Sequence, residues 1–235
     1  MPTVLKVLST TAMKTSLDDM TAAFERQSGF SPVYTFGPSA RITRLVADGE
    51  LHDVAITTDK AIEDLITQGR IVAGSRVDLA RSAMALAVQK GAPKPDISTV
   101  EAFKRTMLAA KSLGMSNPVG GGQSGANLVR IFEALGIADA MKPKCVYGPG
   151  GPAGLIGNFL LRREVEIGIQ QLPELMAVPG IDIVGPLPDG IQSKTVFSAG
   201  LAAGAAQPEG GRALIAYLKT ETAAKVMREK GMETP

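Results

Sequence analysis

Five short segments of the chain are rich in small hydrogen-bonding residues, and each follows an apolar, β-branched stretch. Four of the five lead straight into a stretch with helical periodicity. The start of a helix leaves about four backbone N–H groups unpaired and carries roughly half a positive charge. Hydroxyl and amide donors at several such starts would bind an oxyanion. The candidate ligand-binding residues in these segments are Ser9, Thr10, Thr11, Ser39, Thr57, Thr58, Gln123, Ser124, Gly125, Gln170 and Gln171.

Each segment taken alone also fits an ordinary helix cap, because Ser and Thr are common at that position. The feature that favours a binding site is repetition. Every predicted strand in the N-terminal part of the chain ends in the same neutral, hydrogen-bonding chemistry. The segments together therefore predict a site for a small anion.

Three cations add to this pattern. Lys14 and Arg41 fall in the first turn of predicted helices, where the helix dipole disfavours a positive charge. Their side chains either extend into water or turn toward a bound carboxylate. Arg41 is the stronger candidate for ligand binding, because a guanidinium pairs with a carboxylate through two hydrogen bonds. Arg81, at a predicted crossing between domains, is a third candidate.

The sequence offers no recognisable catalytic or metal-binding set. His52 is the single histidine and directly precedes a predicted strand, at the end of the sheet away from the polar segments, so no Ser-His-Asp or Cys-His set can be built reliably around it. Cys145 is the single cysteine, and no Cys/His cluster has zinc-ligand spacing. We expect His52 and Cys145 to be structural. The glycine run 120–122 is not followed by Lys and Ser or Thr, so it is not a phosphate-binding P-loop. We therefore expect neither a metal nor a cofactor.

Composition narrows the classes of partner. The chain has 235 residues, 45% of them hydrophobic, and a net charge of +2. That charge is too small to predict binding to nucleic acid or to an anionic membrane. No apolar run reaches the roughly 18 residues of a membrane span, so no membrane insertion is expected. Residues 1–8 do not resemble an export signal, so the expected location is the periplasm if a signal has been removed and otherwise the cytoplasm.

Strands and helices alternate along the chain, which is typical of an α/β fold with mostly parallel sheets flanked by helices. The sequence predicts strands at residues 4–9, 31–36, 53–56, 83–88, 111–115, 144–147, 166–170 and 195–201. It predicts helices at residues 13–27, 40–48, 60–68, 99–110, 126–135, 153–163 and 209–231, the last of these broken near 220–222.

The late return of a strand after the second run of elements predicts two lobes with two crossings between them. Lobe one would comprise residues 1–80 and 197–235, and lobe two residues 81–196. The expected hinges are residues 81–83 and 197–200. Because ligands of open α/β sheets bind beyond the carboxyl ends of strands, the five polar segments are expected to face one cleft.

This arrangement resembles the molybdate-binding family of type II periplasmic solute-binding proteins. The resemblance is carried by residues 5–26, 35–40, 53–58, 76–81, 164–170 and 196–201. It implies a two-lobed fold that closes on an oxyanion and delivers it to an ABC importer. Ser39 matches a family serine, whereas Ala12 and Gln171 fall near positions of a family serine and tyrosine. These departures favour an organic di- or tricarboxylate over molybdate.

Aconitate isomerase, an enzyme, is similar to the same family, and this similarity keeps an isomerase as the alternative function. Its reaction is an allylic proton shift, which needs a group that removes a proton and a group that returns it. Asp59, Tyr34 and Lys14 are candidates for that role. A ligand-sensing module like the effector domains of LysR-type regulators is a third alternative.

Overall fold

The computed structural model describes residues 3–120 and 122–235, and the chain forms two compact units. Unit 1 comprises Met1–Ser82 and Thr195–Pro235, and unit 2 comprises Ala83–Lys194. The two-lobed α/β prediction is confirmed. The chain crosses between the units at 82/83 and 194/195, two residues from each expected boundary. The predicted hinge at residues 197–200 is wrong, because this segment lies inside a central strand of unit 1.

Unit 1 contains a five-stranded mixed sheet in the order β2-β1-β3-β10-β4. β1 runs parallel to both β2 and β3, whereas β10 runs antiparallel to both β3 and β4. β10 is the strand by which the chain returns to unit 1, and it enters the sheet from the opposite end. The bounds are Thr3–Thr10 for β1, Phe30–Gly37 for β2, Val54–Thr58 for β3, Val77–Ser82 for β4 and Thr195–Leu201 for β10.

Unit 2 repeats this plan with the order β7-β6-β8-β5-β9. β6 is parallel to β7 and β8, and β5 is antiparallel to β8 and β9. Each sheet is therefore mixed rather than mostly parallel. The sequence did not predict β4 or β9, which are edge strands paired with the crossing strand of their unit. The bounds are Met84–Gln89 for β5, Leu113–Ser116 for β6, Cys145–Gly148 for β7, Ile167–Gln171 for β8 and Ile181–Pro186 for β9.

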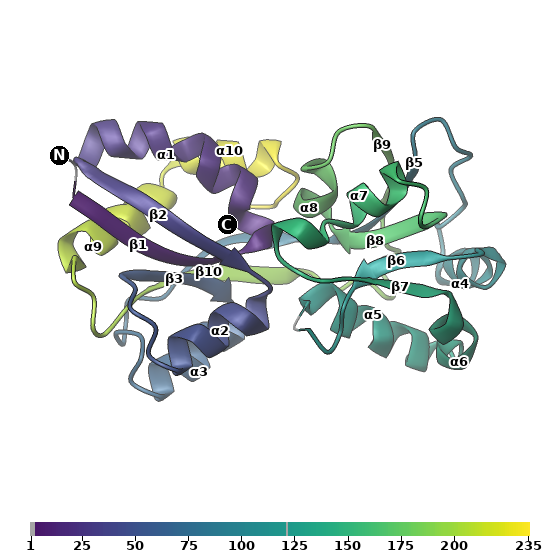
Figure 1. Ribbon diagram of the computed structural model, residues 1–235, viewed down its shortest axis with the longest axis horizontal. Helices are drawn as coiled ribbons and strands as arrows, with labels where there is room; N and C mark the ends of the chain where they lie inside the picture. The colour runs from purple at the N-terminus through teal and green to yellow at the C-terminus, as the bar shows by residue number, and fades with distance from the viewer. Residues whose placement is uncertain (1–2, 121) are drawn as a thin grey trace. The chain divides into compact units, whose positions relative to one another are not determined.

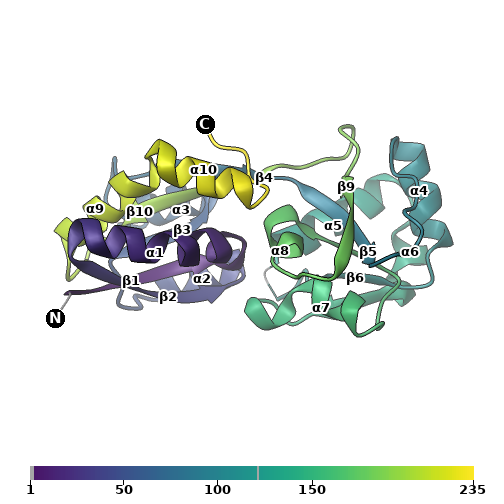
Figure 2. The same cartoon turned by 90° about the horizontal axis from the view of Figure 1, so that it is seen from above.

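Helices cover both faces of the unit 1 sheet because successive strand side chains point to opposite faces. Leu5, Val7 and Ile56 pack with the first set of helices, whereas Leu8 and Ala55 pack with the second. Figure 1 shows the two helical layers, and Figure 2 shows α1 and α10 side by side. The first set is α1 (Lys14–Ser28), α9 (Pro208–Leu218) and α10 (Glu221–Glu229), and the second is α2 (Ser39–Ala47) and α3 (Asp59–Thr67).

Unit 2 is layered in the same way. Phe103, Leu113 and Leu128 belong to the core on one face of its sheet, and Ala85 and Leu160 to the core on the other. Figure 1 shows α5 and α6 on one side of the sheet and α7 and α8 on the other. The helices are α4 (Val100–Ala109), α5 (Gln123–Ala134), α6 (Ala138–Met141), α7 (Ile156–Leu161) and α8 (Leu172–Met176).

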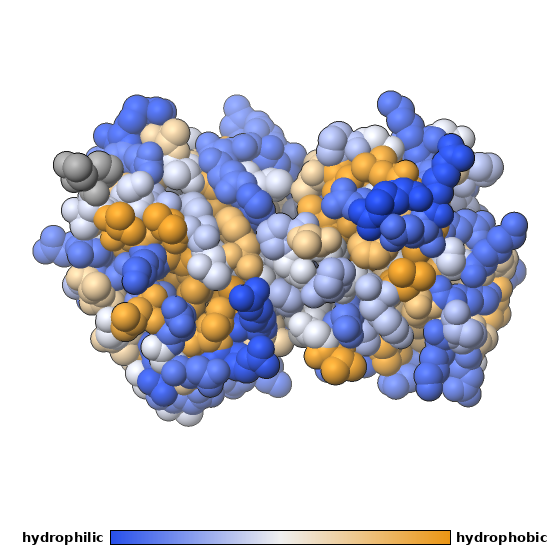
Figure 3. Space-filling model, viewed as in Figure 1, coloured by the Kyte–Doolittle hydropathy of each residue, from blue (hydrophilic) through white to orange (hydrophobic). Residues whose placement is uncertain are grey.

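The surface of unit 1 shows where apolar side chains remain in contact with water. Figure 3 shows apolar residues over β1 and β2 of this unit. Within these two strands, Val4 and Val33 are 52% and 55% exposed. Both precede the carboxyl ends of their strands, so this apolar surface is separate from the polar ends of the strands. In the part of the chain that the structure describes, no helix has the length and apolarity needed to cross a bilayer.

A buried carboxylate, Asp53, ties together the elements of unit 1. Its two oxygens accept the backbone N–H groups of Lys6 at 2.8 Å and of Gln207 at 2.7 Å. Gln207 immediately precedes α9, where a negative charge is favoured by the helix dipole. The backbone of Asp53 also accepts from Ala202 N–H at 2.9 Å. One residue before β3 thus joins β1, the end of β10 and the start of α9.

We expect Asp53→Ala to lower the free energy of unfolding by about 2–5 kcal/mol, because it leaves two buried N–H groups without an acceptor. Urea unfolding followed by circular dichroism measures this change. Asp48→Ala, at an exposed site in the same unit, is the matched control and should change stability by less than about 0.5 kcal/mol. An Asp53→Ala protein as stable as the wild type would contradict this role.

Candidate functional site

The carboxyl ends of β1 and β2 meet at one edge of the unit 1 sheet, where Thr10 lies opposite Gly37. Here Thr10 Oγ1 lies 3.0 Å from Ser39 Oγ, so two of the predicted ligand-binding hydroxyls are brought together. Thr10 is only 4% exposed and Ser39 6%. Ser39 is the first residue of α2, so its hydroxyl lies beside the unpaired N–H groups of that helix start.

A second layer of hydroxyls holds Ser39 in place. Thr43, one helical turn later, donates from Oγ1 to the Ser39 carbonyl at 2.9 Å. Thr57 donates to the same carbonyl at 3.3 Å, and its hydroxyl lies 3.3 Å from that of Thr43. Thr57 is a fully buried residue of β3, and its hydroxyl links this strand to the first residue of α2. Thr43 was not predicted from the sequence, although its i+4 spacing from Ser39 was visible there.

Two other predicted residues use their hydroxyls locally. Thr58 caps α3, with its Oγ1 accepting the N–H of Ala61 at 3.4 Å. This is the ordinary capping role that the sequence left open. Ser9 is fully buried and donates to the Thr10 carbonyl at 3.3 Å. Both residues therefore support the edge on which Thr10 and Ser39 lie.

Two buried hydroxyls near the start of α1 have unused hydrogen-bonding capacity. Thr11 lies in the short 3₁₀ turn Thr11–Met13, and Ser16 lies in the first turn of α1. Within the described residues, neither Thr11 Oγ1 nor Ser16 Oγ has a hydrogen-bond partner. A buried hydroxyl without a partner costs about 1–3 kcal/mol, so a bound group that engages it gains that much. Sequence analysis missed Ser16, although its place in the first turn of the predicted helix was apparent.

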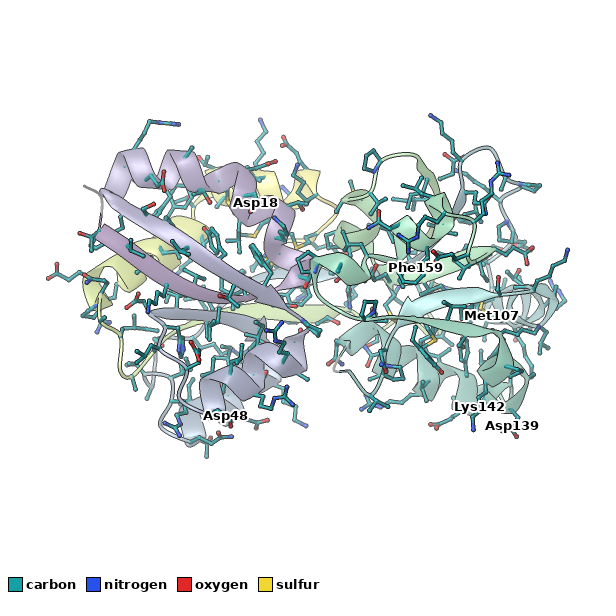
Figure 4. All side chains as sticks on the ribbon, in the orientation of Figure 1. Asp18, Asp48, Met107, Asp139, Lys142 and Phe159 are labelled. Atoms are coloured by element: carbon teal, nitrogen blue, oxygen red, sulfur yellow. The ribbon has the colours of Figure 1, made fainter. Side chains whose placement is uncertain are left out.

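Lys14 and Arg41, the two cations near this edge, differ in whether their charge is already paired. Lys14 Nζ lies 2.5 Å from Asp18 Oδ2, one turn along α1 (Figure 4), and 5.0 Å from the centre of the Phe36 ring. Its charge is therefore already paired. Arg41 is exposed and forms no ion pair with any residue that the structure describes. Arg41 thus keeps a free guanidinium on α2, two residues after Ser39.

Arg81 lies near the carboxyl end of β4, an edge strand of the unit 1 sheet, and its backbone pairs with that of Glu233. β3 and β4 both run antiparallel to β10, so Arg81 lies at the same edge of the sheet as Thr10, separated from it by β3 and β10.

Unit 2 has a hydroxyl cluster of its own at the carboxyl ends of β6 and β8. Ser124 Oγ donates to Ser116 Oγ at 3.1 Å, and the Gln170 amide donates to the same oxygen at 3.4 Å. Gln170 Oε1 also accepts the N–H of Ile156 at 2.8 Å, at the start of α7. Ser116 is the centre of this cluster and was missed, because the predicted strand ended one residue too early.

Glycine permits the close approach of α5 to β6. A Cβ on Gly125 would lie 2.1 Å from the carbonyl oxygen of Ser116, and one on Gly122 would lie 2.5 Å from Ser116 Cβ. The predicted Gly125 is thus required for packing. Gln123, the first residue of α5, is partly exposed and donates to Asn127 at 3.1 Å. Gly121 of the predicted glycine turn lies outside the described residues.

The end of β8 leads into α8, which begins with a capping arrangement. Gln171 is 3% exposed and stands immediately before α8, and Glu174 is the third residue of the helix. The Glu174 carboxylate accepts the backbone N–H of Gln171. Enclosure of the carboxyl group by protein raises the pKa of Glu174 to about 7, even though the residue keeps some exposed surface. The pattern Gln-x-x-Glu was visible in the sequence but was not recognised.

The three candidates named for proton transfer differ in their surroundings. Burial raises the pKa of Tyr34 to about 12, although the Thr21 hydroxyl donates to its phenol oxygen at 3.3 Å. Tyr34 is therefore protonated at neutral pH and cannot act as a base. Lys14 is paired with Asp18. Asp59 is the partly exposed first residue of α3.

The described residues also line cavities within each unit. One of about 130 Å³ in unit 1 is lined by residues including His52 and Arg70. Another of about 210 Å³ in unit 2 is lined by Cys145, with Asp139 and Lys142 of the same cavity labelled in Figure 4. Burial raises the pKa of the Cys145 thiol, so the thiolate is scarce at neutral pH. Among residues 3–120 and 122–235, no three His, Cys, Asp or Glu side chains are grouped to hold a metal ion.

The sequence of this chain matches a known protein family. A family model described as bacterial extracellular solute-binding protein matches residues 5–233. Aconitate isomerase from Pseudomonas sp. is 36% identical over 237 residues, covering 98% of this chain and 88% of that protein. The molybdate-binding protein ModA of Azotobacter vinelandii is 27% identical over 222 residues, covering 92% and 84%.

The fold comparison agrees with the sequence comparison. The solved periplasmic molybdate-binding protein of Azotobacter vinelandii matches with a TM-score of 0.78 at 19% identity, covering 98% of this chain and 99% of that one. The resemblance to molybdate-binding proteins seen in the sequence is thereby confirmed. The chain belongs to the family of bacterial extracellular solute-binding proteins.

Proposed function

We propose that this protein binds a small organic polycarboxylate through the hydroxyl- and amide-rich ends of its strands. The observation that carries the proposal is the buried Thr10–Ser39 hydroxyl pair at the start of α2. Thr11 and Ser16 offer further buried hydroxyls in the same unit. Neutral donors at helix starts bind oxyanions without a counter-charge, which suits a ligand that must also be released.

A carboxylate ligand accounts for features that a bare oxyanion does not require. Arg41 is unpaired among the described residues and can engage a second carboxylate of the ligand. The similarity to aconitate isomerase points to a tricarboxylate of the aconitate type. For a binding protein of this family, we propose a periplasmic location and delivery of the ligand to an ABC importer.

A second candidate function is isomerisation of the bound carboxylate. It is favoured by 36% identity to aconitate isomerase across 98% of the chain, which exceeds the 27% identity to the molybdate-binding relative. An allylic proton shift needs no redox partner and only one well-placed proton-transferring group, so a binding scaffold can acquire it with few changes.

We expect Thr10→Ala and Ser39→Ala each to weaken binding of the preferred carboxylate by about 1–3 kcal/mol, about 5- to 150-fold, because each removes a hydrogen bond to a charged group. Titration calorimetry against trans-aconitate, cis-aconitate, citrate, molybdate and sulfate measures this. Ser124→Ala, titrated with the same ligand, tests whether the unit 2 cluster takes part.

Thr67→Ala is the control, because Thr67 is exposed and its hydroxyl donates to the Glu63 carbonyl of its own helix. No heat with any of these anions, using protein freed of bound ligand, would count against the proposal. Unchanged affinity in both Thr10→Ala and Ser39→Ala would exclude this edge as the site.

Arg41 distinguishes the ligand classes. We expect Arg41→Ala to weaken tricarboxylate binding by about 1.5–3 kcal/mol and to leave molybdate or sulfate binding nearly unchanged, because only the larger ligand presents a further carboxylate. Arg44→Ala, an exposed residue of the same helix, controls for net charge. Equal tricarboxylate affinity in the wild type and Arg41→Ala would remove the argument for a carboxylate ligand.

The isomerase candidate has its own test. If it is correct, trans-aconitate incubated with micromolar wild-type protein yields cis-aconitate, which chromatography separates from the substrate. Heat-denatured protein supplies the background rate. Substrate that stays unchanged while calorimetry shows binding would leave a binding protein without this activity.

A further inference from the structure

A cavity of unit 1 lies at the end of the sheet opposite Thr10. Its wall includes His52, which comes just before β3, and Gly204, which follows β10. Because β3 runs parallel to β1, the residues before β3 lie at the edge away from the carboxyl end of β1. Asp48, labelled in Figure 4, follows α2 at this same end of the unit. The cavity is therefore separate from the strand ends that carry the proposed function.

His52 has one nitrogen in use and one that is not. Nδ1 lies 2.7 Å from the backbone carbonyl oxygen of Glu50, and because a carbonyl only accepts, Nδ1 carries the hydrogen. Burial lowers the pKa of His52, so the ring is neutral at pH 7 and Nε2 keeps a lone pair. His52 is 8% exposed, and its Nε2 has no hydrogen-bond partner among the described residues.

The bond to Glu50 does not by itself require a histidine. An asparagine donates to a nearby carbonyl as well, and its side chain places no second nitrogen in a buried position. Buried polar atoms are nearly always hydrogen-bonded, because an unpaired one is unfavourable. Nε2 of His52 is therefore an acceptor that gains from a bound donor, and it belongs to a residue that lines a cavity.

A cation without an acid lies on the same wall. Arg70 is exposed and forms no ion pair within the part of the chain that the structure describes. Its Nη1 lies 3.6 Å from the point where a Cβ on Gly49 would stand, and both residues line the cavity. Its backbone is fixed, with the carbonyl accepting from Ala203 N–H at 2.9 Å. A guanidinium held in this way can bind a carboxylate through two hydrogen bonds.

The rest of the wall sets the size and character of a ligand. Val46 and Ala202 are buried and present short apolar side chains. The cavity of about 130 Å³ has room for at least about four water-sized groups, at about 30 Å³ each. These dimensions suit a short carbon chain with a carboxylate at one end.

We propose that this cavity is a second ligand site of unit 1 and that it binds a short hydroxycarboxylate. The hydroxyl of the ligand donates to His52 Nε2, the carboxylate pairs with Arg70, and the carbon chain packs against Val46 and Ala202. A hydroxyl suits Nε2 better than an ammonium group does, because it donates a hydrogen without bringing a charge into an enclosed place. This site does not depend on the polycarboxylate site at the strand ends.

His52 is the single histidine of the chain, so its ring is a unique NMR probe. In untagged, ¹⁵N-labelled protein at neutral pH, we expect the free ring to be the neutral tautomer with hydrogen on Nδ1. Titration with 2-hydroxybutyrate should move the Nε2 resonance and saturate. Butyrate lacks the hydroxyl and 2-aminobutyrate carries an ammonium in its place, so each should bind at least about fivefold more weakly.

Arg70→Ala tests the cation. It should raise the dissociation constant of 2-hydroxybutyrate by about 10- to 100-fold, because it removes hydrogen bonds between charged groups. Arg26→Ala is the matched control for net charge, since Arg26 is exposed on α1, which packs on the opposite face of the sheet. Its affinity should stay within about twofold of the wild type.

Two further variants test the ring and the cavity. His52→Asn keeps an N–H beside the Glu50 carbonyl and removes Nε2, so it should weaken binding by about 3- to 10-fold, as read from backbone amide shifts. Gly204→Leu fills the cavity from a position where an added Cβ meets no atom within 4 Å, so it should abolish the response of His52. Urea unfolding confirms that both variants are folded.

Four results would overturn the second site. These are hydrogen on Nε2 in the free protein, no response of His52 to 2-hydroxybutyrate, equal binding of butyrate or 2-aminobutyrate, and unchanged affinity in Arg70→Ala. A response that disappears in the Thr10→Ala, Ser39→Ala double variant would also overturn it, because the ligand would then bind at the strand ends.

The proposed function is tested separately. Gly204→Leu should bind the preferred tricarboxylate as the wild type does in calorimetry. Tricarboxylate binding without a response of His52 to 2-hydroxybutyrate would overturn the second site and leave the proposed function intact. A saturable response of His52 in a protein that binds no tricarboxylate would support the second site and overturn the proposed function.

Discussion

Parallel strands that neighbour each other end at the same edge of their sheet, and the helices that follow them must start there. This constraint gathers unpaired N–H groups and short polar side chains without any cation being required. In unit 1 it brings Thr10 at the end of β1 beside Ser39 at the start of α2. In unit 2 it brings Ser116 at the end of β6 beside Ser124 at the start of α5. The two units reached the same chemistry on separate sheets.

The antiparallel strands β10 and β5 connect the crossings between the units to the two sheets. β10 and β5 carry the chain into their units, and each lies between the parallel strands and an edge strand. A strand in that position is hydrogen-bonded on both sides, so β10 is a fixed part of the sheet rather than a hinge. Asp53 adds to this rigidity by holding the N–H groups of Lys6 and Gln207. The polar strand ends are therefore presented by a stiff framework.

Membership of the solute-binding family does not specify which ligand is bound, because neutral hydrogen-bond donors can bind many different oxyanions. Under the proposed function, Arg41 narrows the choice of ligand. Its guanidinium forms no ion pair with the residues that the structure describes, which favours a ligand with more than one carboxylate.

The sequence by itself determined the alternation of strands and helices, the return of the chain to its first unit, and the polar character of the strand ends. These are local properties, because apolar periodicity and cap residues act over a few positions. Thr10 and Ser39 were predicted in this way as ligand-binding residues, and the structure brings their hydroxyls within 3.0 Å of each other. The sequence also placed the crossings between the units within a few residues.

Only the tertiary structure decided which polar groups meet. Ser116 became the centre of a cluster because α5 approaches β6 so closely that Gly125 has no room for a side chain. Thr57 serves the Ser39 carbonyl from inside the sheet, and Ser16 is buried without a partner among the described residues. The raised pKa of Glu174 likewise comes from burial of its carboxyl group in the folded unit. Hydrogen bonds and desolvation are set by distances between elements, and residue order along one strand or helix does not contain those distances.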